Sequence, residues 1–388
     1  MKESIEVRNL GPLKDVYLPE IKPLTVLIGE SASGKSVLMK TIILMRYIYK
    51  MLNIRWYLKN SGISKSPFRL KFEKLIHDDL AQYFGDKNNV YIKYSVTIHG
   101  NTYSIEYRNR KLNTSSAENI PYKDLFLMKE SWISESRNAI PVWTAKAAVN
   151  KKAELGFYFH ETLSDFDKAT EAVKSFDIDY VGMKMKVSGK DGKKKFFVKP
   201  ADESYSELEL KYASSGIQTS APISALVTYF AKHFSFKESA RKSVLDYLYE
   251  ADRLSSYRPE MEIMDMSKKV HIHIEEPELS LFPDAQCKLI ESIAKAAFID
   301  NLPDRSVDIM MATHSPYIIN YLNVILHQNK QDKAKVTSDQ IAIYRIYNGG
   351  LQNLLSRTSS GHYIINTRDL TEQMQRILAE YSSLKNNQ

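Results

Sequence analysis

The feature that most constrains this chain is a glycine-rich octapeptide, Gly29-Glu30-Ser31-Ala32-Ser33-Gly34-Lys35-Ser36. It fits the pattern G-x-x-x-x-G-K-[ST] and follows the apolar run Leu24–Ile28 directly. Such a loop holds a polyphosphate because its backbone N–H groups point inward and the next helix adds the positive end of its dipole. We expect that helix over Val37–Tyr49, which contains no Pro or Gly. The sequence therefore predicts a strand, a phosphate-binding loop and a helix, in that order.

The residue types in the loop suit this role. Gly29 and Gly34 allow a tight turn, because they have no Cβ. Lys35 would reach the β- and γ-phosphates of a nucleoside triphosphate, and the Ser36 hydroxyl would ligate Mg²⁺. A chance match is the alternative, which the flanking strand and helix disfavour. The expected nucleotide-binding residues are Gly29, Glu30, Ser31, Ala32, Ser33, Gly34, Lys35, Ser36 and Val37.

Length and composition limit the class of protein. A chain of 388 residues, 43% of them hydrophobic, predicts one large domain with an insertion, or two lobes, and a substantial core. The single cysteine, Cys287, excludes a disulfide framework and a cysteine-based zinc site. Four of the first ten residues are charged, where a signal peptide would need an apolar stretch, and no run of about 18 apolar residues occurs. We therefore expect a cytoplasmic protein with no signal peptide and no membrane contact.

Hydrophobic patterning predicts alternating strands and helices. Strands are expected over 5–10 and 13–26, and a hairpin over 90–107 would form an antiparallel sheet beside the phosphate-loop sheet. In the second half, strands over 270–274 and 307–312 alternate with helices, which favours a parallel sheet. A closing hairpin is expected over 341–356. Helices are expected over most of 56–84 and over 141–176, 221–234, 237–254, 283–298, 315–327 and 370–384.

A second expected hairpin, 180–187 with 194–198, is rich in lysine. Since the whole chain carries a formal charge of +8, this hairpin could contact a nucleic-acid backbone. A solvated turn kept soluble by its lysines explains the same residues equally well, and the sequence leaves both interpretations open. The lysines are Lys184, Lys186, Lys190, Lys193, Lys194, Lys195 and Lys199.

Two carboxylates follow the apolar strand His271–Ile274. At a strand tip beside a phosphate loop, hydrolysis needs one carboxylate to hold the Mg²⁺ shell and another to polarise the attacking water. We assign the first role to Glu275 and the second to Glu276. An ordinary acidic surface turn is the alternative.

Two further polar stretches are candidates for the same site. His314 follows the apolar strand 307–312 and could donate a hydrogen bond to a γ-phosphate, although a lone histidine is usually structural. The segment Ser214-Ser215-Gly216-Ile217-Gln218 precedes the expected helix 221–234. Its backbone N–H groups and hydroxyls could bind an anion, but a simple capping turn has the same composition.

Four segments, taken in their order along the chain, resemble the motifs of ABC-type ATPases. They are GESASGKS, SSGIQ, IEEPELSLFP and ATHSP. The resemblance is to the branch that includes RecF, SMC heads and OLD-like ATPases, the AAA15 and AAA21 groups. It implies an α/β fold, namely an ABC-ATPase head with a mostly parallel P-loop sheet, an antiparallel β-subdomain and a helical lobe. It implies one domain over 1–388, with a P-loop part (1–135), a helical and signature lobe (136–262, including the hairpin 180–200) and a Walker B part (263–388).

The resemblance also implies a composite site that binds ATP with Mg²⁺ and hydrolyses it to ADP and phosphate. The signature segment would contact ATP bound by a second subunit, so a homodimer or larger homo-oligomer is implied. The implied roles are the Walker A pair for Lys35 and Ser36, the Walker B metal ligand for Glu275, the catalytic glutamate for Glu276, the switch histidine for His314, and the signature in trans for Ser214, Ser215, Gly216 and Gln218.

Four departures from the family pattern predict slow hydrolysis. Ser31-Ala32 stands where many relatives have Asn-Gly, and Ile217 replaces the second glycine of the signature. Glu275 is longer than the usual Asp, and Phe282 stands where His is common. We therefore expect a slow switch rather than a fast motor.

The segments that define several relatives are not expected here. The stretch after Pro316 is too short for a Toprim nuclease domain, and no heptad pattern between Ser36 and Ser214 predicts a coiled-coil arm. The remaining resemblance is to the ATPase subunits of bacterial anti-phage systems such as PARIS or Septu, which imply a separate nuclease (Toprim or HNH type) or toxin effector. The rivals are a RecF-like DNA-binding repair ATPase and, with less support, an OLD-like nuclease.

Overall fold

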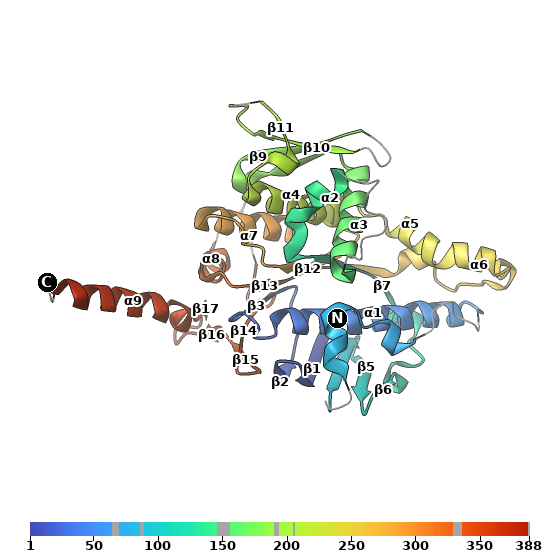
Figure 1. The fold of residues 1–388 in the computed structure, drawn as a ribbon. Helices are drawn as coiled ribbons and strands as arrows, with labels where there is room; N and C mark the ends of the chain where they lie inside the picture. Colours follow the sequence, from blue (N-terminus) through green and yellow to red (C-terminus); the bar gives the residue numbers. More distant parts are fainter. Residues whose placement is uncertain are drawn as a thin grey trace.

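The computed structural model describes residues 1–63, 70–85, 89–145, 156–189, 194–204, 206–328 and 336–386. Figure 1 shows a long helix, α1 (Lys35–Asn60), running across the molecule with a small sheet on one side and a larger sheet carrying a group of helices on the other. The C-terminal helix, α9 (Arg368–Asn386), projects away from this body.

The larger sheet is the phosphate-loop sheet. Its strand order is β15-β14-β3-β13-β12-β7. All neighbouring strands in this order are parallel, except the edge pair β15 and β14, which is antiparallel. Parallel strands are buried on both faces, which explains the continuous apolar runs that the sequence shows. The carboxyl ends of β3, β13, β12 and β7 therefore meet at one edge. The bounds are β3 (Leu24–Ile28), β7 (Phe126–Ile133), β12 (Ser267–Glu275), β13 (Ser306–Thr313), β14 (Ile341–Tyr347) and β15 (Gly350–Asn353).

The smaller sheet is antiparallel, with the order β2-β1-β4-β5-β6. Alternate residues of its strands are buried, as expected of a sheet with one face toward the core. Helix α1 lies between the two sheets, and both sides of it are buried, so its sequence is apolar nearly all round. The bounds are β1 (Lys2–Leu10), β2 (Leu13–Leu18), β4 (Tyr91–Ile98), β5 (Asn101–Arg108) and β6 (Lys111–Asn113).

A helical lobe covers the other face of the phosphate-loop sheet. It contains a third sheet of order β11-β10-β9-β8, and a small hairpin, β16 with β17, precedes α9. Helix α7 begins at a proline. The N–H of the first helical residue has no partner within the helix, so a proline, which lacks this N–H, loses no hydrogen bond there. The bounds are α2 (Ile140–Ala145), α3 (Phe157–Ala172), β8 (Ser175–Ile178), β9 (Met183–Ser188), β10 (Lys195–Pro200), β11 (Leu208–Glu209), α4 (Ser215–Thr228), α5 (Phe236–Ala240), α6 (Asp246–Glu250), α7 (Pro283–Phe298), α8 (Pro316–His327), β16 (Leu355–Arg357) and β17 (Tyr363–Ile365).

Several expected elements are shorter in the structure. The helix expected over most of 56–84 is wrong beyond Asn60: α1 ends there, Gly62 adopts a φ of 86°, and residues 70–85 form only short 3-10 turns. The strand expected over 13–26 is two strands, because Pro19 and Pro23 interrupt it. The helix expected over 237–254 is broken by a π-helical turn at 241–245. Part of the helix expected over 141–176 lies outside the described residues.

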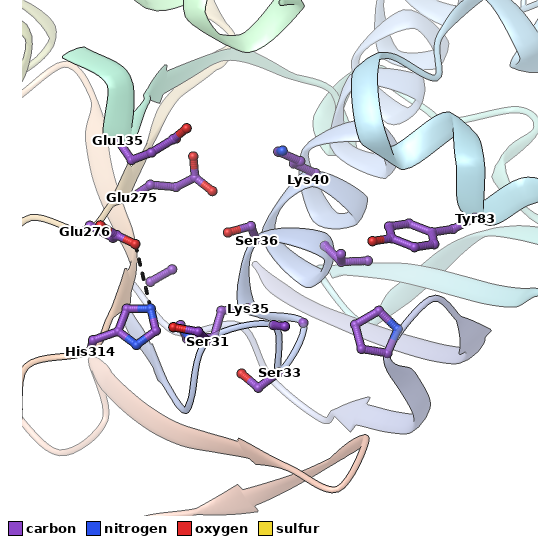
Figure 2. A pocket seen from close by; sticks show the side chains of 15 residues that line it. Ser31, Ser33, Lys35, Ser36, Lys40, Tyr83, Glu135, Glu275, Glu276 and His314 are labelled. Atoms are coloured by element: carbon purple, nitrogen blue, oxygen red, sulfur yellow. Dashed lines mark ion pairs between the residues drawn. The ribbon is translucent and has the colours of Figure 1, made fainter. Parts of the chain in front are cut away.

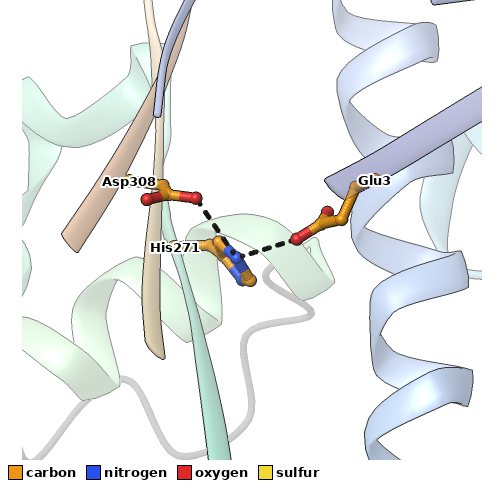
Figure 3. Close-up of side chains that lie close together, drawn as sticks. All are labelled: Glu3, His271 and Asp308. Atoms are coloured by element: carbon orange, nitrogen blue, oxygen red, sulfur yellow. Dashed lines mark ion pairs between the residues drawn. The ribbon is translucent and has the colours of Figure 1, made fainter. Parts of the chain in front are cut away.

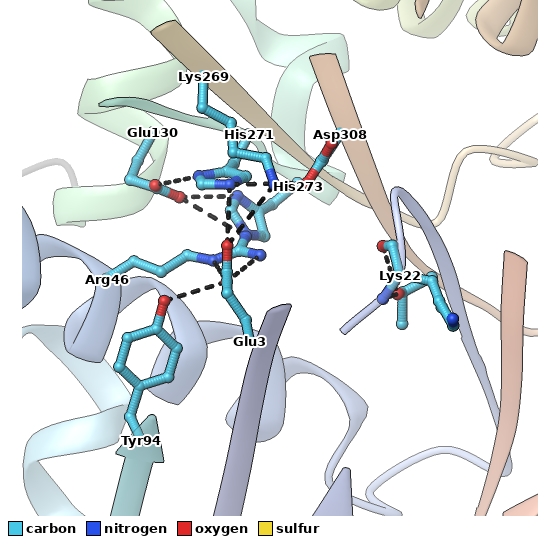
Figure 4. A network of polar contacts seen from close by, with 10 residues as sticks. Glu3, Lys22, Arg46, Tyr94, Glu130, Lys269, His271, His273 and Asp308 are labelled. Carbon is cyan, nitrogen blue, oxygen red and sulfur yellow. Dashed lines mark hydrogen bonds and ion pairs between the residues drawn. The ribbon is translucent and has the colours of Figure 1, made fainter. Parts of the chain in front are cut away.

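A buried ionic network joins the two sheets through α1 (Figure 4). The Arg46 guanidinium on α1 is 2% exposed and donates to Glu3 Oε2 on β1 at 2.7 and 2.8 Å. A third contact, 3.2 Å to His273 Nε2, reaches β12. Tyr94 on β4 also donates to Glu3 Oε2, at 3.0 Å. One arginine therefore ties α1 to both sheets.

His271 of β12 occupies the centre of this network (Figure 3). Its Nδ1 lies 2.6 Å from Glu130 Oε1, and its Nε2 lies 3.5 Å from Glu3 Oε1. Burial and Arg46 would lower the pKa of His271, but Glu130 and Glu3 outweigh them and raise it. The Lys269 ammonium lies 2.8 Å from Asp308 Oδ2, so a protein cation already balances that carboxylate. The contacts with Glu130 and Glu3 therefore favour the positively charged form of His271.

Candidate nucleotide-binding site

The phosphate loop connects β3 to α1, as its sequence predicts. Gly34 has a φ of 106°, and a Cβ there would lie 2.7 Å from Leu13 Cδ2. A Cβ on Gly29 would lie 2.7 Å from the Ile346 carbonyl oxygen. Neither position accepts a larger residue without movement of its neighbours. The two glycines therefore set the shape of the loop, as the motif requires.

Lys35 lies folded against this loop. Its ammonium donates to the carbonyl oxygens of Gly29, at 2.9 Å, and Glu30, at 2.8 Å. The residue is 6% exposed, and burial lowers its pKa, although the carboxylates of Glu276 and Glu278 oppose that shift. The ammonium is thus held at the loop by two weak acceptors that a phosphate oxygen can replace.

A cavity of about 510 Å³ opens above the loop (Figure 2), and we call it the nucleotide cavity. The ends of four neighbouring strands, β3, β13, β12 and β7, contribute to its wall. Every residue expected at the catalytic and metal positions, Ser36, Glu275, Glu276 and His314, lines it. The other lining residues are Pro12, Ser31, Ala32, Ser33, Gly34, Lys35, Val37, Lys40, Tyr83, Glu135 and Ala312.

Glu275 lies at the floor of the nucleotide cavity and shares a proton with Glu135. Burial, and next the hydrogen bond to Glu135, raise the pKa of Glu275 to about 8, and the residue is 5% exposed. The same hydrogen bond holds the pKa of Glu135 at about 2. The pair therefore keeps one proton at neutral pH, and we place it on the more buried Glu275. The sequence analysis did not select Glu135, which follows β7 immediately after Ser134 and reaches Glu275 only because β7 pairs with β12.

The floor of the nucleotide cavity fits a hard divalent cation. The Ser36 hydroxyl hydrogen-bonds Glu275, so a hydroxyl and a carboxylate oxygen are already in contact there. These are the oxygen ligands that Mg²⁺ accepts, usually with waters and phosphate oxygens completing its shell. Because a ligating carboxylate is deprotonated, the proton held by Glu275 would leave when the metal binds.

Glu276 and His314 lie side by side on one wall of the nucleotide cavity (Figure 2). His314 Nε2 lies 3.7 Å from Glu276 Oε1, and their side chains are 35% and 39% exposed. Glu276 has a φ of 43°, which turns its side chain off the line of β12. Glu278 fixes the end of β13, because its carboxylate accepts hydrogen bonds from the His314 N–H at 2.6 Å and from the Thr313 hydroxyl at 2.8 Å.

Arg137 is a site residue that the sequence analysis did not assign. It is fully buried, and its guanidinium donates to four backbone carbonyls. Two belong to Glu275, at 2.7 Å, and Glu276, at 2.6 Å. The others belong to Ser134, at 3.0 Å, and Thr219 of α4, at 3.1 Å. Although burial lowers its pKa to about 10, Arg137 stays charged at neutral pH. It links the β12 and β7 tips to the signature helix.

The signature segment lies outside the nucleotide cavity of its own chain. It forms the start of α4, where Ser214 and Ser215 are exposed. Gly216 packs on the turn after β12, since a Cβ there would lie 2.8 Å from the Ser280 carbonyl oxygen. The Gln218 side chain donates to the carbonyls of Lys211, at 2.9 Å, and Ala213, at 3.0 Å. Gln218 is therefore held within its own lobe, and the two serines are the residues that face outward.

Three of the five described lysines of the hairpin pair with acids of the same lobe. Lys184 pairs with Asp177 at 3.1 Å, and Lys199 pairs with Glu203. Lys194 contacts Asp167 at 2.6 Å and Glu171 at 3.3 Å. Lys186 and Lys195 are exposed, whereas Lys190 and Lys193 lie outside the described residues. This pairing weakens the case for nucleic-acid binding by the hairpin. Among the described helices, none has the length and apolar character to cross a membrane.

Sequence comparison identifies the family. A profile described as the AAA ATPase domain matches residues 69–319, which is more than half of the chain. The chain belongs to this AAA ATPase domain family. The match begins after the phosphate loop, so the loop and the matched region are separate observations that agree. The expected α/β fold and the expected ATPase family, which implies nucleotide binding, are confirmed, whereas the resemblance to particular anti-phage systems stays a prediction.

Solved structures related to this ATPase domain are distant in sequence. The SMC head domain from Thermotoga maritima is 9% identical, with a TM-score of 0.38 over 92% of this chain and 99% of that one. The recombination mediator protein RecF is 11% identical, with a TM-score of 0.39, and the match covers 91% of this chain and 98% of that one. The dimeric ATP-binding cassette MJ0796 bound to ADP and Pi is 11% identical, with a TM-score of 0.31, and the match covers 90% of this chain and 96% of that one. With TM-scores this low, the family rests on the sequence profile. No curated protein matches.

Proposed function

We propose that this AAA ATPase domain protein binds and slowly hydrolyses ATP in the nucleotide cavity. One observation carries the proposal: four neighbouring strand ends bring the phosphate loop, two carboxylates and His314 around one cavity. These parts lie up to 285 positions apart in the sequence, between Gly29 and His314, and only the parallel sheet brings them together. A chance phosphate-loop match would not place a metal-binding floor and an exposed carboxylate beside it.

Each residue has a task in this proposal. Lys35 exchanges the two loop carbonyls for phosphate oxygens, and the loop N–H groups orient the β- and γ-phosphates. Ser36 and Glu275 would hold Mg²⁺, which when bound neutralises charge that develops on the phosphates. Glu276 orients and polarises the attacking water, and His314, beside it, reports whether the γ-phosphate is present.

We propose further that two copies complete the site. The exposed Ser214 and Ser215 at the start of α4 offer hydroxyls and N–H groups to an anion, but they do not line the cavity of their own chain. In a symmetric dimer, the same segment of each copy would meet the ATP bound by the other. ATP would then hold the dimer closed, and hydrolysis would release it. Under this proposal the chain is one composite ATPase domain with the three parts 1–135, 136–262 and 263–388.

We propose that this switch controls a separate effector, a Toprim or HNH nuclease or a toxin, in anti-phage defence in the cytoplasm. The order of the motifs supports this role, and the departures at Ser31-Ala32 and Ile217 support slow turnover. Co-purification of an effector with this protein, released on phage challenge, is the expected result. A lone dimer that does not alter the outcome of infection would contradict it.

Glu276→Gln tests the catalytic assignment. The variant should bind ATP within a few-fold of wild type, but lose turnover by about 10²–10⁴-fold because the amide cannot polarise water. Size-exclusion chromatography with light scattering should show a dimer trapped by Mg·ATP. Glu250→Gln, on the distant helix α6, is the matched control and should behave like wild type. Normal turnover by Glu276→Gln would refute the assignment.

The RecF-like rival has a test of its own. Duplex DNA binding that weakens steeply with salt, and that disappears in the double variant Lys186→Ala with Lys195→Ala, would favour direct DNA contact. These two lysines are exposed and belong to the hairpin. We expect no such binding, because other lysines of the hairpin are already paired with acids.

A further inference from the structure

Helix α9 carries large apolar side chains into solvent. It projects from the body of the molecule, as Figure 1 shows. Ile377, Leu378, Tyr381 and Leu384 are 53%, 57%, 63% and 61% exposed. Single exposed apolar residues need no explanation, but four within two turns form a patch that is costly to leave in water. The helix therefore has the properties of an interface that another surface covers.

The spacing of these residues identifies the kind of interface. In the sequence, apolar residues recur along α9 at alternating intervals of four and three, through Leu370, Met374, Ile377, Tyr381 and Leu384. This is the a/d repeat of a coiled coil, with Met374 and Tyr381 at a, and Ile377 and Leu384 at d. Leu378 falls at position e and widens this apolar face on one side. A partner helix with the same a/d repeat would cover the face, with Leu378 at its edge.

The charges of α9 favour a second copy of the same helix. Arg368, Arg376 and Lys385 balance Asp369, Glu372 and Glu380, so two copies do not repel each other. In a parallel pair, Glu380 at g would stand opposite Lys385 at e of the next heptad in the other copy. This pairing of opposite charges occurs in both directions across a twofold axis.

We propose that α9 helices from two copies of this protein pair as a short parallel coiled coil. The contact does not rest on the proposed function, because none of the described residues of α9 lines the nucleotide cavity. Its consequence for the ATPase is nevertheless direct. Two domains joined in this way face each other at an effective concentration of about millimolar, so an ATP-dependent contact between them would form at low protein concentration.

The oligomeric state of the full chain without nucleotide tests the proposal. We expect wild type to dimerise, and Ile377→Asp and Leu384→Asp each to weaken the dimer by about 100-fold or more, since two buried side chains are lost per pair. Ala379→Asp adds the same charge on the opposite side of the helix and should leave the dimer intact. Sedimentation equilibrium gives the dissociation constants. A wild type that stays monomeric, or an unchanged dimer in Leu384→Asp, would overturn the proposal.

Orientation and independence from ATP can be tested separately. In a Cys287→Ser background, Leu384→Cys should form a disulfide between copies, because equivalent d positions meet in a parallel pair. Ser382→Cys, which lies off the repeat, is the control and should stay reduced. Lys35→Ala should remove nucleotide binding and leave this cross-link unchanged. Loss of the cross-link in Lys35→Ala, or its absence in Leu384→Cys, would refute a parallel, ATP-independent pair.

Discussion

Replacing Arg137 by methionine should separate ATP binding from hydrolysis. Methionine preserves most of the apolar volume but removes the guanidinium that holds the carbonyls of Glu275, Glu276, Ser134 and Thr219. Hydrogen bonds from a charged donor contribute about 1.5–3 kcal/mol each. Burial of the charge offsets much of that sum, so we expect a net loss of about 3–5 kcal/mol in the free energy of unfolding, because four carbonyl groups lose their buried donor.

The effect on turnover should be larger than the effect on nucleotide affinity. Glu276 has a φ of 43°, and a non-glycine residue in that region carries about 1–3 kcal/mol of strain that its surroundings must hold. Without Arg137, the Glu276 carbonyl is released and its carboxylate can move. A misplacement of about 1 Å can lower a rate about 10²-fold. Since Arg137 does not line the nucleotide cavity, ATP affinity should change only a few-fold.

Three measurements on one protein preparation decide the matter. Urea denaturation gives the free energy of unfolding, phosphate release gives turnover, and a fluorescent ATP analogue gives affinity. Arg305→Met is the matched control, because Arg305 is 8% exposed and donates to the Phe234 carbonyl at 2.6 Å away from the nucleotide cavity. It should lose stability and keep turnover at temperatures where it is folded. If Arg137→Met also keeps turnover, Arg137 only stabilises the fold and the reasoning is refuted.

Three further predictions follow from the loop, the shared proton and the buried network. Gly34→Ala, which forces a Cβ into a φ of 106°, should weaken ATP binding at least tenfold, at a cost of about 1–3 kcal/mol in loop strain, as titration with the same analogue would show. Because Glu275 holds a proton with a pKa of about 8, the apparent Mg²⁺ affinity in the presence of ATP should fall up to about tenfold for each pH unit below 8, and Glu135→Gln should flatten this dependence. The folded pKa of His271 is raised, so its contribution to stability is complete below the unfolded value near 6.5 and is lost as pH rises through the folded pKa. Urea unfolding at pH 6 and pH 9 should show this loss in wild type and in the exposed control His362→Gln, but not in His271→Gln.

Local patterns in the sequence predicted most elements around the site, but they did not predict β7, which precedes Glu135 and Arg137. Continuous apolar runs predicted the other buried parallel strands, and the α7 helix was expected at its observed bounds, because a proline begins it and an apolar stripe follows. The extent of α1 and the segment after it were mispredicted. Burial between two sheets extends α1 to Asn60, whereas residues 70–85 mix apolar with charged residues and form only 3-10 turns.

The contribution of Glu135 and Arg137 could not be predicted from sequence. Both follow β7, which pairs with β12 although more than 130 residues separate their ends. Without that pairing, neither residue has a reason to contact Glu275. A proton shared between two carboxylates also depends on burial, which a linear pattern does not report.

By itself, the sequence determined that this chain has a phosphate loop, which carboxylates and histidine could act with it, and which elements carry them. These properties are local, since they depend on residue type, spacing and hydrophobic period within a few turns. The tertiary structure alone decided that Ser36, Glu275, Glu276 and His314 share one cavity, that Arg137 holds the strand tips, and that Ser214 and Ser215 face away from it. These are properties of the strand order β3-β13-β12-β7, which joins residues distant in sequence at one edge of a sheet.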